Sequence, residues 1–356
     1  MSEKFFLAFF PLFSFYWHFL HTLFTSPAFL LTASPGSMLN MSVWNPASPN
    51  DTCILYLHPN SGNRIDAIRS KAVSLATGLG CSACGFDFAG CGMSEGEYIS
   101  LGVNEKDDVA MVVSFLLSQG FRRLIIWGRS MGAASATLFL GAYQPLISKY
   151  IIAVILDSPF TSFRGIVKAQ AKHRKIPQFL RHPAIYLLNC SIKKTCNFEL
   201  QQITPIAAAK ALEPPAFSTI PQDKLCESCS SPCAACVPFA FPILVLSATG
   251  DIIVPAEMSG ELYESFKTPK IRVVFNGEHN SPRPIEVFRV VVALLAGVID
   301  ASSPTSKKTS SADRASGKFL LIYICNFHVL SHLLLIYICK LHWNLNTMFV
   351  CQVNSF

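Results

Sequence analysis

The sequence predicts an α/β fold in which a mainly parallel sheet is flanked by helices and carries a cap insertion. Over residues 52–298, short apolar segments alternate with longer segments that carry apolar residues at helical spacing. This alternation is typical of parallel strands joined by crossover helices. The segment 158–239 breaks the rhythm and contains several prolines, so we interpret it as a cap between the strand that ends at Asp157 and the strand before Asp251.

Each expected element has a local reason. Apolar segments on both sides of the turn at residues 34–36 predict a hairpin. Short apolar runs predict buried strands, and longer segments with apolar residues at helical spacing predict helices. The expected strands are 28–33, 38–44, 52–57, 81–90 (which runs into a glycine-rich loop), 122–127, 150–157, 241–248 and 271–275. The expected helices are 64–79, 105–119, 130–143 and 285–298.

The two ends of the chain are apolar and differ from this core. Residues 5–24 form an uncharged, Phe-rich run just long enough to span a membrane, although Pro11 interrupts it. A membrane anchor and an amphipathic segment packed on the core both remain open. The expected parts of the chain are 1–27, an apolar segment; 28–157, the first part of the core; 158–239, the cap; 240–300, the second part of the core; 301–317, a linker; and 318–356, an apolar tail.

The tail contains an internal repeat, since residues 320–328 recur almost unchanged as residues 334–342. Three interpretations stay open: a membrane helix over 319–339, an interaction helix, or sequence outside any folded domain.

Charge and cysteine content exclude two classes of protein. The net charge of +7 is concentrated in the cap, where residues 164–194 contain no acidic residue. This fits an anionic membrane or an acidic partner better than nucleic acid, because no nucleic-acid-binding module is present, and a solvated helical face remains open. Thirteen cysteines in 356 residues do not resemble a small secreted disulfide scaffold. We expect a membrane-associated protein on the cytoplasmic side, or otherwise a cytoplasmic one, without a cleavable signal peptide. The eight basic residues of segment 164–194 are Arg164, Lys168, Lys172, Arg174, Lys175, Arg181, Lys193 and Lys194.

Four cysteines of the cap have spacings that resemble a metal site. The two CxxC pairs are Cys226 with Cys229 and Cys233 with Cys236. Only three residues separate the pairs, which is much shorter than the usual linker in zinc knuckles. Free thiols are the favoured interpretation, and structural zinc or lipidated cysteines are the alternatives.

The strongest chemical signal is Ser130, in the pentapeptide Gly-Arg-Ser-Met-Gly at residues 128–132. The pentapeptide directly follows the expected strand 122–127 and precedes a helix that opens with small residues. A sharp turn between a strand and a helix exposes the serine hydroxyl above the sheet, as in a nucleophile elbow. We therefore expect Ser130 to be a catalytic nucleophile.

A serine nucleophile needs a base, and the base needs an acid to fix its tautomer. Asp251 and His279 follow two later strands in the expected order, so both belong at the carboxyl edge of the sheet. Asp157 also ends a strand before the histidine and is the alternative acid.

The oxyanion hole should use two backbone N–H groups. Met131 follows the nucleophile and supplies the first. Asn60, in the loop after strand 52–57, is the expected second donor, because Pro59 has no N–H group.

These motifs resemble the serine-aminopeptidase-like and depalmitoylase-like branch of the α/β-hydrolase superfamily. The matching segments lie at residues 58–64, 85–98, 128–132, 250–255 and 277–280, and the likeness covers roughly residues 28–300. Pro59 stands where the family usually has glycine. The resemblance implies a Ser130, His279 and Asp251 triad that hydrolyses esters, thioesters or, less often, peptides without a metal or organic cofactor. The alternatives are a catalytically silent scaffold and a serine aminopeptidase-like peptidase.

Overall fold

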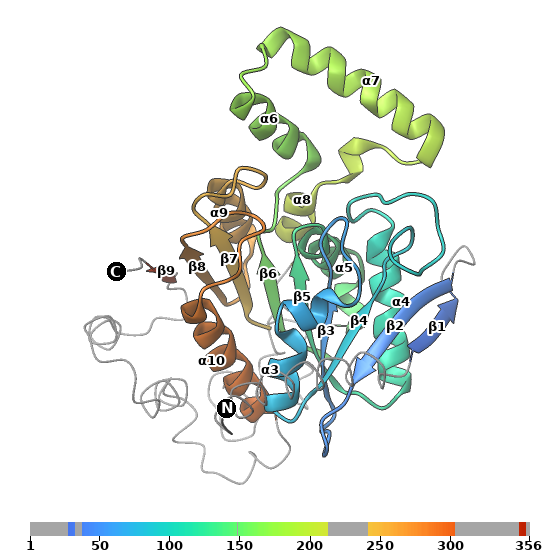
Figure 1. Ribbon diagram of the computed structural model, residues 1–356, viewed down its shortest axis with the longest axis vertical. Coiled ribbons are helices and arrows are strands. Elements are labelled where there is room, and N and C mark those ends of the chain that lie inside the picture. Colours follow the sequence, from blue (N-terminus) through green and yellow to red (C-terminus); the bar gives the residue numbers. More distant parts are fainter. Residues whose placement is uncertain (1–27, 33–37, 148, 213–240, 303–348, 354–356) are drawn as a thin grey trace, which may run out of the picture.

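The computed structural model describes residues 28–32, 38–147, 149–212, 241–302 and 349–353. These residues form a nine-stranded sheet in the order β1-β2-β4-β3-β5-β6-β7-β8-β9 (Figure 1). Pairing is antiparallel between β1 and β2 and between β2 and β4, and parallel between all other neighbours. The expected α/β class with a mainly parallel sheet is therefore confirmed. The strands are β1 (Ala28–Thr32), β2 (Met38–Trp44), β3 (Thr52–Leu57), β4 (Ser82–Phe86), β5 (Arg123–Arg129), β6 (Ile151–Asp157), β7 (Ile243–Ala248), β8 (Lys270–Phe275) and β9 (Phe349–Val353).

Helices cover both faces of the sheet. The central strands β3 and β6 are buried along their whole length, which explains why their sequences are continuous apolar runs rather than alternating ones. One core cluster joins the sheet to α4, α5, α8 and α9, and a second joins its other face to α2, α3 and α10. The helical segments are α2 (Asp66–Arg69), α3 (Ala72–Gly78), α4 (Glu105–Ser118), α5 (Met131–Ile147), α6 (Phe163–His173), α7 (Gln178–Cys196), the 3-10 helix η1 (Leu200–Gln202), α8 (Pro205–Ala211), α9 (Ala256–Ser265) and α10 (Ile285–Ser302).

Some elements differ from the sequence-based expectation, among them α9, for which no helix was predicted. The helix expected over residues 64–79 is broken into α2 and α3 by Lys71, whose left-handed backbone (φ of 66°) cannot continue a right-handed helix. The strand β9 comes from the apolar tail and pairs with β8, a role that the repeat in the tail did not suggest.

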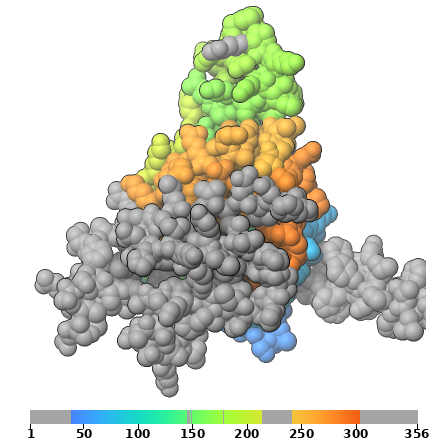
Figure 2. All heavy atoms as spheres, turned by 90° about the vertical axis from the view of Figure 1, so that its left-hand side faces the viewer, coloured from blue at the N-terminus to red at the C-terminus, as the bar shows by residue number. Residues whose placement is uncertain are grey.

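The cap insertion lies between β6 and β7, as expected, and its described part is helical. Ser162 starts α6 by accepting a hydrogen bond from the Gly165 N–H (3.1 Å), an N-cap that the apolar pattern did not reveal. Phe160, Phe198 and Leu200 form a small core at the base of the cap. From this base, α6 and α7 rise clear of the sheet on the side of the carboxyl ends of its strands (Figure 1), and they form the top of the molecule in Figure 2.

Several predicted features lie outside the described residues. They are the apolar run at 5–24, the four cysteines Cys226, Cys229, Cys233 and Cys236, most of the linker at 301–317, and the repeat at 320–342. Among the residues that the structure does describe, no cluster of His, Cys, Asp and Glu side chains could hold a metal ion.

Candidate active site

Ser130 lies at the tip of the predicted turn between β5 and α5. Its backbone φ of 53° is in the left-handed region, which the strand-to-helix turn requires and which residues other than glycine rarely adopt. The Ser130 N–H donates a hydrogen bond to the carbonyl of Asp157 (2.8 Å), and its own carbonyl accepts one from the Ala134 N–H (3.0 Å). These bonds hold the strained turn between the ends of β5 and β6.

Two glycines make this turn possible. A Cβ atom on Gly128 would overlap the carbonyl of Gly132, and a Cβ atom on Gly132 would overlap the carbonyl of Leu57 at the end of β3. Backbone atoms cannot move aside as a flexible side chain can, so both positions need glycine. The close contact between Gly132 and the Leu57 carbonyl also brings the start of α5 next to the loop that follows β3.

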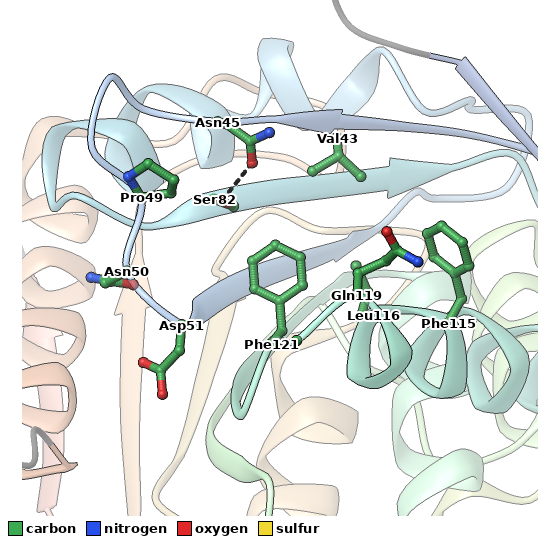
Figure 3. A pocket seen from close by; sticks show the side chains of 11 residues that line it. Val43, Asn45, Pro49, Asn50, Asp51, Ser82, Phe115, Leu116, Gln119 and Phe121 are labelled. Carbon is green, nitrogen blue, oxygen red and sulfur yellow. Dashed lines mark hydrogen bonds between the residues drawn. The ribbon is translucent and has the colours of Figure 1, made fainter.

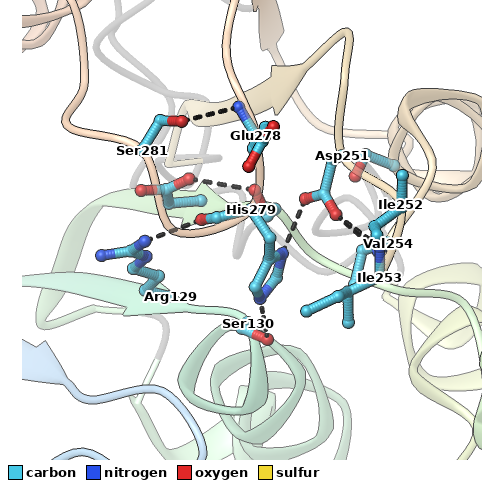
Figure 4. A network of polar contacts seen from close by, with 12 residues as sticks. Arg129, Ser130, Asp251, Ile252, Ile253, Val254, Glu278, His279 and Ser281 are labelled. Atoms are coloured by element: carbon cyan, nitrogen blue, oxygen red, sulfur yellow. Dashed lines mark hydrogen bonds and ion pairs between the residues drawn. The ribbon is translucent and has the colours of Figure 1, made fainter.

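The structure brings the three predicted triad residues together (Figure 4). His279 Nε2 lies 3.0 Å from Ser130 Oγ, and His279 Nδ1 lies 2.6 Å from Asp251 Oδ2. All three residues are buried. The arrangement favours the neutral tautomer with a proton on Nδ1, because the carboxylate accepts that proton and leaves Nε2 free to accept the Ser130 O–H.

The backbone around Asp251 fixes the orientation of its carboxylate. Oδ1 accepts hydrogen bonds from the N–H groups of Ile253 (2.9 Å) and Val254 (2.7 Å), while Oδ2 faces His279. Each carboxylate oxygen therefore has its own partners, and rotation of the side chain would break all of these bonds at once.

Asp157, the alternative acid, has a different partner. Arg283 Nε lies 2.9 Å from Asp157 Oδ2, and Arg283 Nη2 lies 2.8 Å from Asp157 Oδ1. Both side chains are nearly inaccessible to solvent, at 7% and 5% exposure. Asp157 ends β6 and Asp251 lies in the loop after the neighbouring strand β7, but only the Asp251 carboxylate faces His279.

Two arginines that the sequence analysis missed hold the backbone of His279. Arg129 Nη2 donates to the His279 carbonyl (2.7 Å), and Arg283 Nη2 donates to the same oxygen (3.2 Å). Arg129 is the variable second residue of the elbow, and Arg283 lies four residues after the histidine, so neither stood out by type or spacing. Both act as positioning residues for the imidazole.

Replacement of Arg283 by Gln should lower the free energy of unfolding by about 3 kcal/mol, because Asp157 would keep a buried, unpaired charge. Urea denaturation at pH 7 measures the change. Arg69→Gln is the matched control, since Arg69 is 65% exposed in its ion pair and its loss should cost no more than about 0.5 kcal/mol. Equal effects of the two substitutions would contradict the structural role of the Arg283 pair.

The predicted oxyanion loop follows β3 directly. The buried His58 donates from Nδ1 to the Pro59 carbonyl (2.8 Å) and accepts the Phe88 N–H at Nε2 (3.1 Å), and burial lowers the pKa of His58, which keeps the ring neutral. The Pro59 carbonyl also accepts the Gly62 N–H (2.9 Å). Pro59 thus takes part in the turn through its carbonyl, and its missing N–H leaves both of these bonds intact.

Asn60 and Met131 come from segments that touch. The carbonyls of Leu57 and His58 lie against Gly132, so the loop with Asn60 runs beside the first turn of α5, where Met131 is the first residue. The first N–H groups of a helix have no partner within it and are available to an anion. Asn60 also lines a pocket of about 370 Å³ together with residues 90–92, 97 and 99 of the loop after β4.

Two buried acidic side chains bind the backbone of the loop that follows β4. Glu105 accepts the N–H groups of Ser100 (2.6 Å) and Gly102 (2.7 Å), and Asp108 accepts the Ala89 N–H (3.0 Å). Burial is the main cause that raises the pKa of Asp108 to about 7, with smaller contributions from Glu105 and Asp107. Asp108 therefore keeps its proton in the folded protein at pH values where it would lose it in the unfolded chain.

The raised pKa of Asp108 predicts that the free energy of unfolding falls as the pH rises from about 4 to about 7. The reason is that the unfolded state binds fewer protons than the native state over that window. Asp108→Asn removes the ionisable carboxyl group but keeps a side-chain oxygen that can accept the Ala89 N–H. It should raise the free energy of unfolding by about 2 to 4 kcal/mol at pH 8 and change it little at pH 4. Urea denaturation at both pH values checks this, and the exposed Asp300→Asn is the control. A pH-independent effect of Asp108→Asn would contradict it.

A second pocket, of about 320 Å³, lies at the other edge of the sheet (Figure 3). Asp51, Ser82 and Phe121, which line it, stand at or before the amino ends of β3, β4 and β5. Ser130 and its partners follow the carboxyl ends, so this pocket has no part in the candidate site.

Comparisons with known proteins identify relatives over parts of the chain. No protein-family model matches the chain. The uncharacterized protein YqkD of Bacillus subtilis is 27% identical over 239 residues, which cover 65% of this chain and 67% of that protein. Lysophosphatidylserine lipase ABHD12 of Danio rerio is 32% identical over 132 residues, 35% of this chain. The chain spans about a third of the length of the lipase, since the match covers 33% of it.

Solved structures are similar over most of the chain. The esterase Pf2001 of Pyrococcus furiosus has a TM-score of 0.53 at 19% identity, covering 79% of this chain and 94% of the esterase. The α/β hydrolase domain-containing protein 10 from mouse has a TM-score of 0.51 at 17% identity, covering 78% of this chain and 100% of that protein. The parallel sheet, the sharp turn at Ser130 and these similar structures show that the chain has the α/β-hydrolase fold that its motifs predict.

Proposed function

We propose that this protein is a serine hydrolase that cleaves carboxylic esters or thioesters through an acyl-enzyme. The hydrogen-bonded series from Ser130 through His279 to Asp251, with distances of 3.0 and 2.6 Å, is the observation that carries the proposal. The printed names of the esterase and lipase relatives support hydrolysis of esters in general. The silent-scaffold alternative lacks a comparable observation, because the turn at Pro59 is intact.

The first half of the reaction transfers the acyl group to the enzyme. Ser130 Oγ attacks the substrate carbonyl carbon while His279 Nε2 takes the hydroxyl proton, and Asp251 stabilises the resulting imidazolium. The N–H groups of Met131 and Asn60 would bind the oxyanion. When the tetrahedral species collapses, the bond to the alcohol or thiol breaks and His279 returns the proton to that leaving group.

The second half releases the acid. A water molecule gives a proton to His279 Nε2 and attacks the acyl carbon, and collapse of the second tetrahedral species returns the proton to Ser130 Oγ. The products are a carboxylic acid and the free enzyme. Every proton in this cycle passes through His279, so no metal or organic cofactor enters the scheme.

Apolar side chains at the mouth of the site favour a substrate with an apolar acyl group, on a lipid or on a protein. Ile252 and Ile253 directly follow the triad acid and are 54% and 38% exposed. We further propose that the protein associates with a membrane on its cytoplasmic side, through the apolar ends of the chain and the basic cap. In the described residues, no helix is both long and apolar enough to cross a membrane.

A panel of soluble model substrates tests the reaction class. The purified full chain should hydrolyse a short-chain p-nitrophenyl ester and the corresponding acyl thioester, and amino-acid p-nitroanilides should react far more slowly. Rapid turnover of the anilides with no esterase activity would favour the peptidase alternative and contradict the proposal.

A further inference from the structure

The outward side of α7 carries apolar side chains that no part of the described structure covers. We call this side the outer face of α7. Phe179, Tyr186 and Leu187 on it are 74%, 68% and 67% exposed, which is far more than such side chains normally show. The opposite side of the helix packs on the base of the cap, since Ile192 contacts the small core there and Asn189 accepts the Leu200 N–H (2.9 Å). The outer face consists of Phe179, Pro183, Tyr186, Leu187, Cys190, Lys193 and Lys194.

Basic side chains surround these apolar ones. Arg164, Lys168 and Lys172 recur every four residues and are exposed on α6, and the turn to α7 adds Arg174 and Lys175. Among the eight basic residues of segment 164–194, Lys193 is the only one in an ion pair within the described part of the chain, with Glu199 at 2.6 Å. In the described part of the chain, the cap thus presents apolar groups and mostly unpaired basic side chains on one protruding unit.

An anionic lipid bilayer matches both properties. Its headgroup region neutralises lysine and arginine, and the adjacent acyl region takes in aromatic and aliphatic side chains. The apolar segments of this chain at 5–24 and 319–339 contain no acidic residue and could not neutralise the cap. In a second copy of the chain, the same positive charges would meet across the interface and repel.

The position of the cap gives such binding a consequence for the candidate site. In Figure 1, α6 and α7 stand above the carboxyl ends of the strands. Ser130 and His279 follow the carboxyl ends of β5 and β8, so they lie on this side of the sheet. The Gln170 side chain on α6 donates to the carbonyl of Ile252 (2.5 Å), so the cap is tied to the mouth of the site. A membrane bound to the cap therefore lies on the side from which substrate reaches Ser130.

We infer that the outer face of α7 and the basic residues of α6 form a docking surface for anionic membranes, which turns the mouth of the site toward the bilayer. This inference rests on the membrane association proposed above and specifies its surface and lipid charge. It does not depend on the hydrolytic step, because Ser130 takes no part in docking.

Vesicle sedimentation with the full chain carrying Ser130→Ala tests the inference. We expect partitioning to vesicles of phosphatidylcholine with 30% phosphatidylserine to be at least about tenfold stronger than to phosphatidylcholine alone, and to weaken in 0.5 M NaCl. The triple variant K172Q/R174Q/K175Q should lose about 100-fold in partitioning to the anionic vesicles, since each basic residue near the surface contributes about fivefold. The triple variant K149Q/K267Q/R289Q removes the same charge from exposed basic residues outside the cap and should bind like the parent.

The apolar part of the surface is tested separately. Phe179→Ser with Leu187→Ser should weaken binding about tenfold, whereas Met93→Ser with Ile285→Ser, which removes exposed apolar groups outside the cap, should not. Thermal unfolding of each variant checks its fold, so docking can be judged even if no hydrolysis is found. The inference is overturned if binding ignores lipid charge, if the cap and control variants behave alike, or if the cap binds single-stranded RNA and not the anionic vesicles.

Discussion

Ser130→Ala should reduce hydrolysis of a short-chain ester by about 10⁴- to 10⁶-fold in kcat. The substitution removes the only hydroxyl that lies against His279 Nε2 in the described structure, and with it the acyl-enzyme route. The fold should survive, because alanine is no more strained than serine at the left-handed φ of 53° and the backbone bonds of the turn remain.

Initial rates and thermal unfolding of the same preparation separate chemistry from stability. The exposed Ser114 on α4, whose hydroxyl donates to the Ala110 carbonyl, provides the matched control, and Ser114→Ala should keep full activity. If Ser130→Ala retained most of the parent activity, the nucleophile would lie elsewhere and the proposed function would be wrong.

Asp251→Asn should lower kcat by about 10⁴-fold with little change in KM. The reason lies in the two backbone N–H groups of Ile253 and Val254, which bind Oδ1 and would hold the amide oxygen of asparagine in the same place. The amide NH₂ must then face His279 Nδ1 and donate to it. This selects the tautomer with the proton on Nε2, which cannot accept the proton of Ser130.

The parallel substitution Asp157→Asn distinguishes the two acids that the sequence left open. Asp157 pairs with Arg283, so its loss should lower the free energy of unfolding and leave kcat within about tenfold of the parent. Steady-state kinetics of both variants provide the comparison. The reverse result, with Asp157→Asn nearly inactive and Asp251→Asn nearly unaffected, would assign the acid to β6.

The sheet and the order of the site residues were predictable because they depend on local signals. Buried parallel strands such as β3 and β6 are continuous apolar runs, and the carboxyl ends of such strands share one edge. Ser130, Asp251 and His279 each follow the carboxyl end of a parallel strand, so their meeting follows from topology. The choice between Asp157 and Asp251 depends on Arg283, which lies 126 residues after Asp157, and a single sequence contains no signal for that pair.

The cap was predictable in position but not in structure. Pro183 lies inside α7, and the large apolar residues on the outer face of that helix have no partner within the described structure, so the usual pattern of a buried apolar stripe is absent. The break at Lys71 also has no local signature, because lysine is an ordinary helix residue. In both places the tertiary structure overrides what propensity and periodicity indicate.

Mapping the adduct of a fluorophosphonate probe by peptide mass spectrometry tests the central claim most directly. The probe reacts with serines that a neighbouring base activates, and the account predicts one modified residue, Ser130, with labelling lost in His279→Ala and retained in Ser114→Ala. Absence of labelling in the folded full chain, or labelling of another serine that persists in His279→Ala, would contradict it.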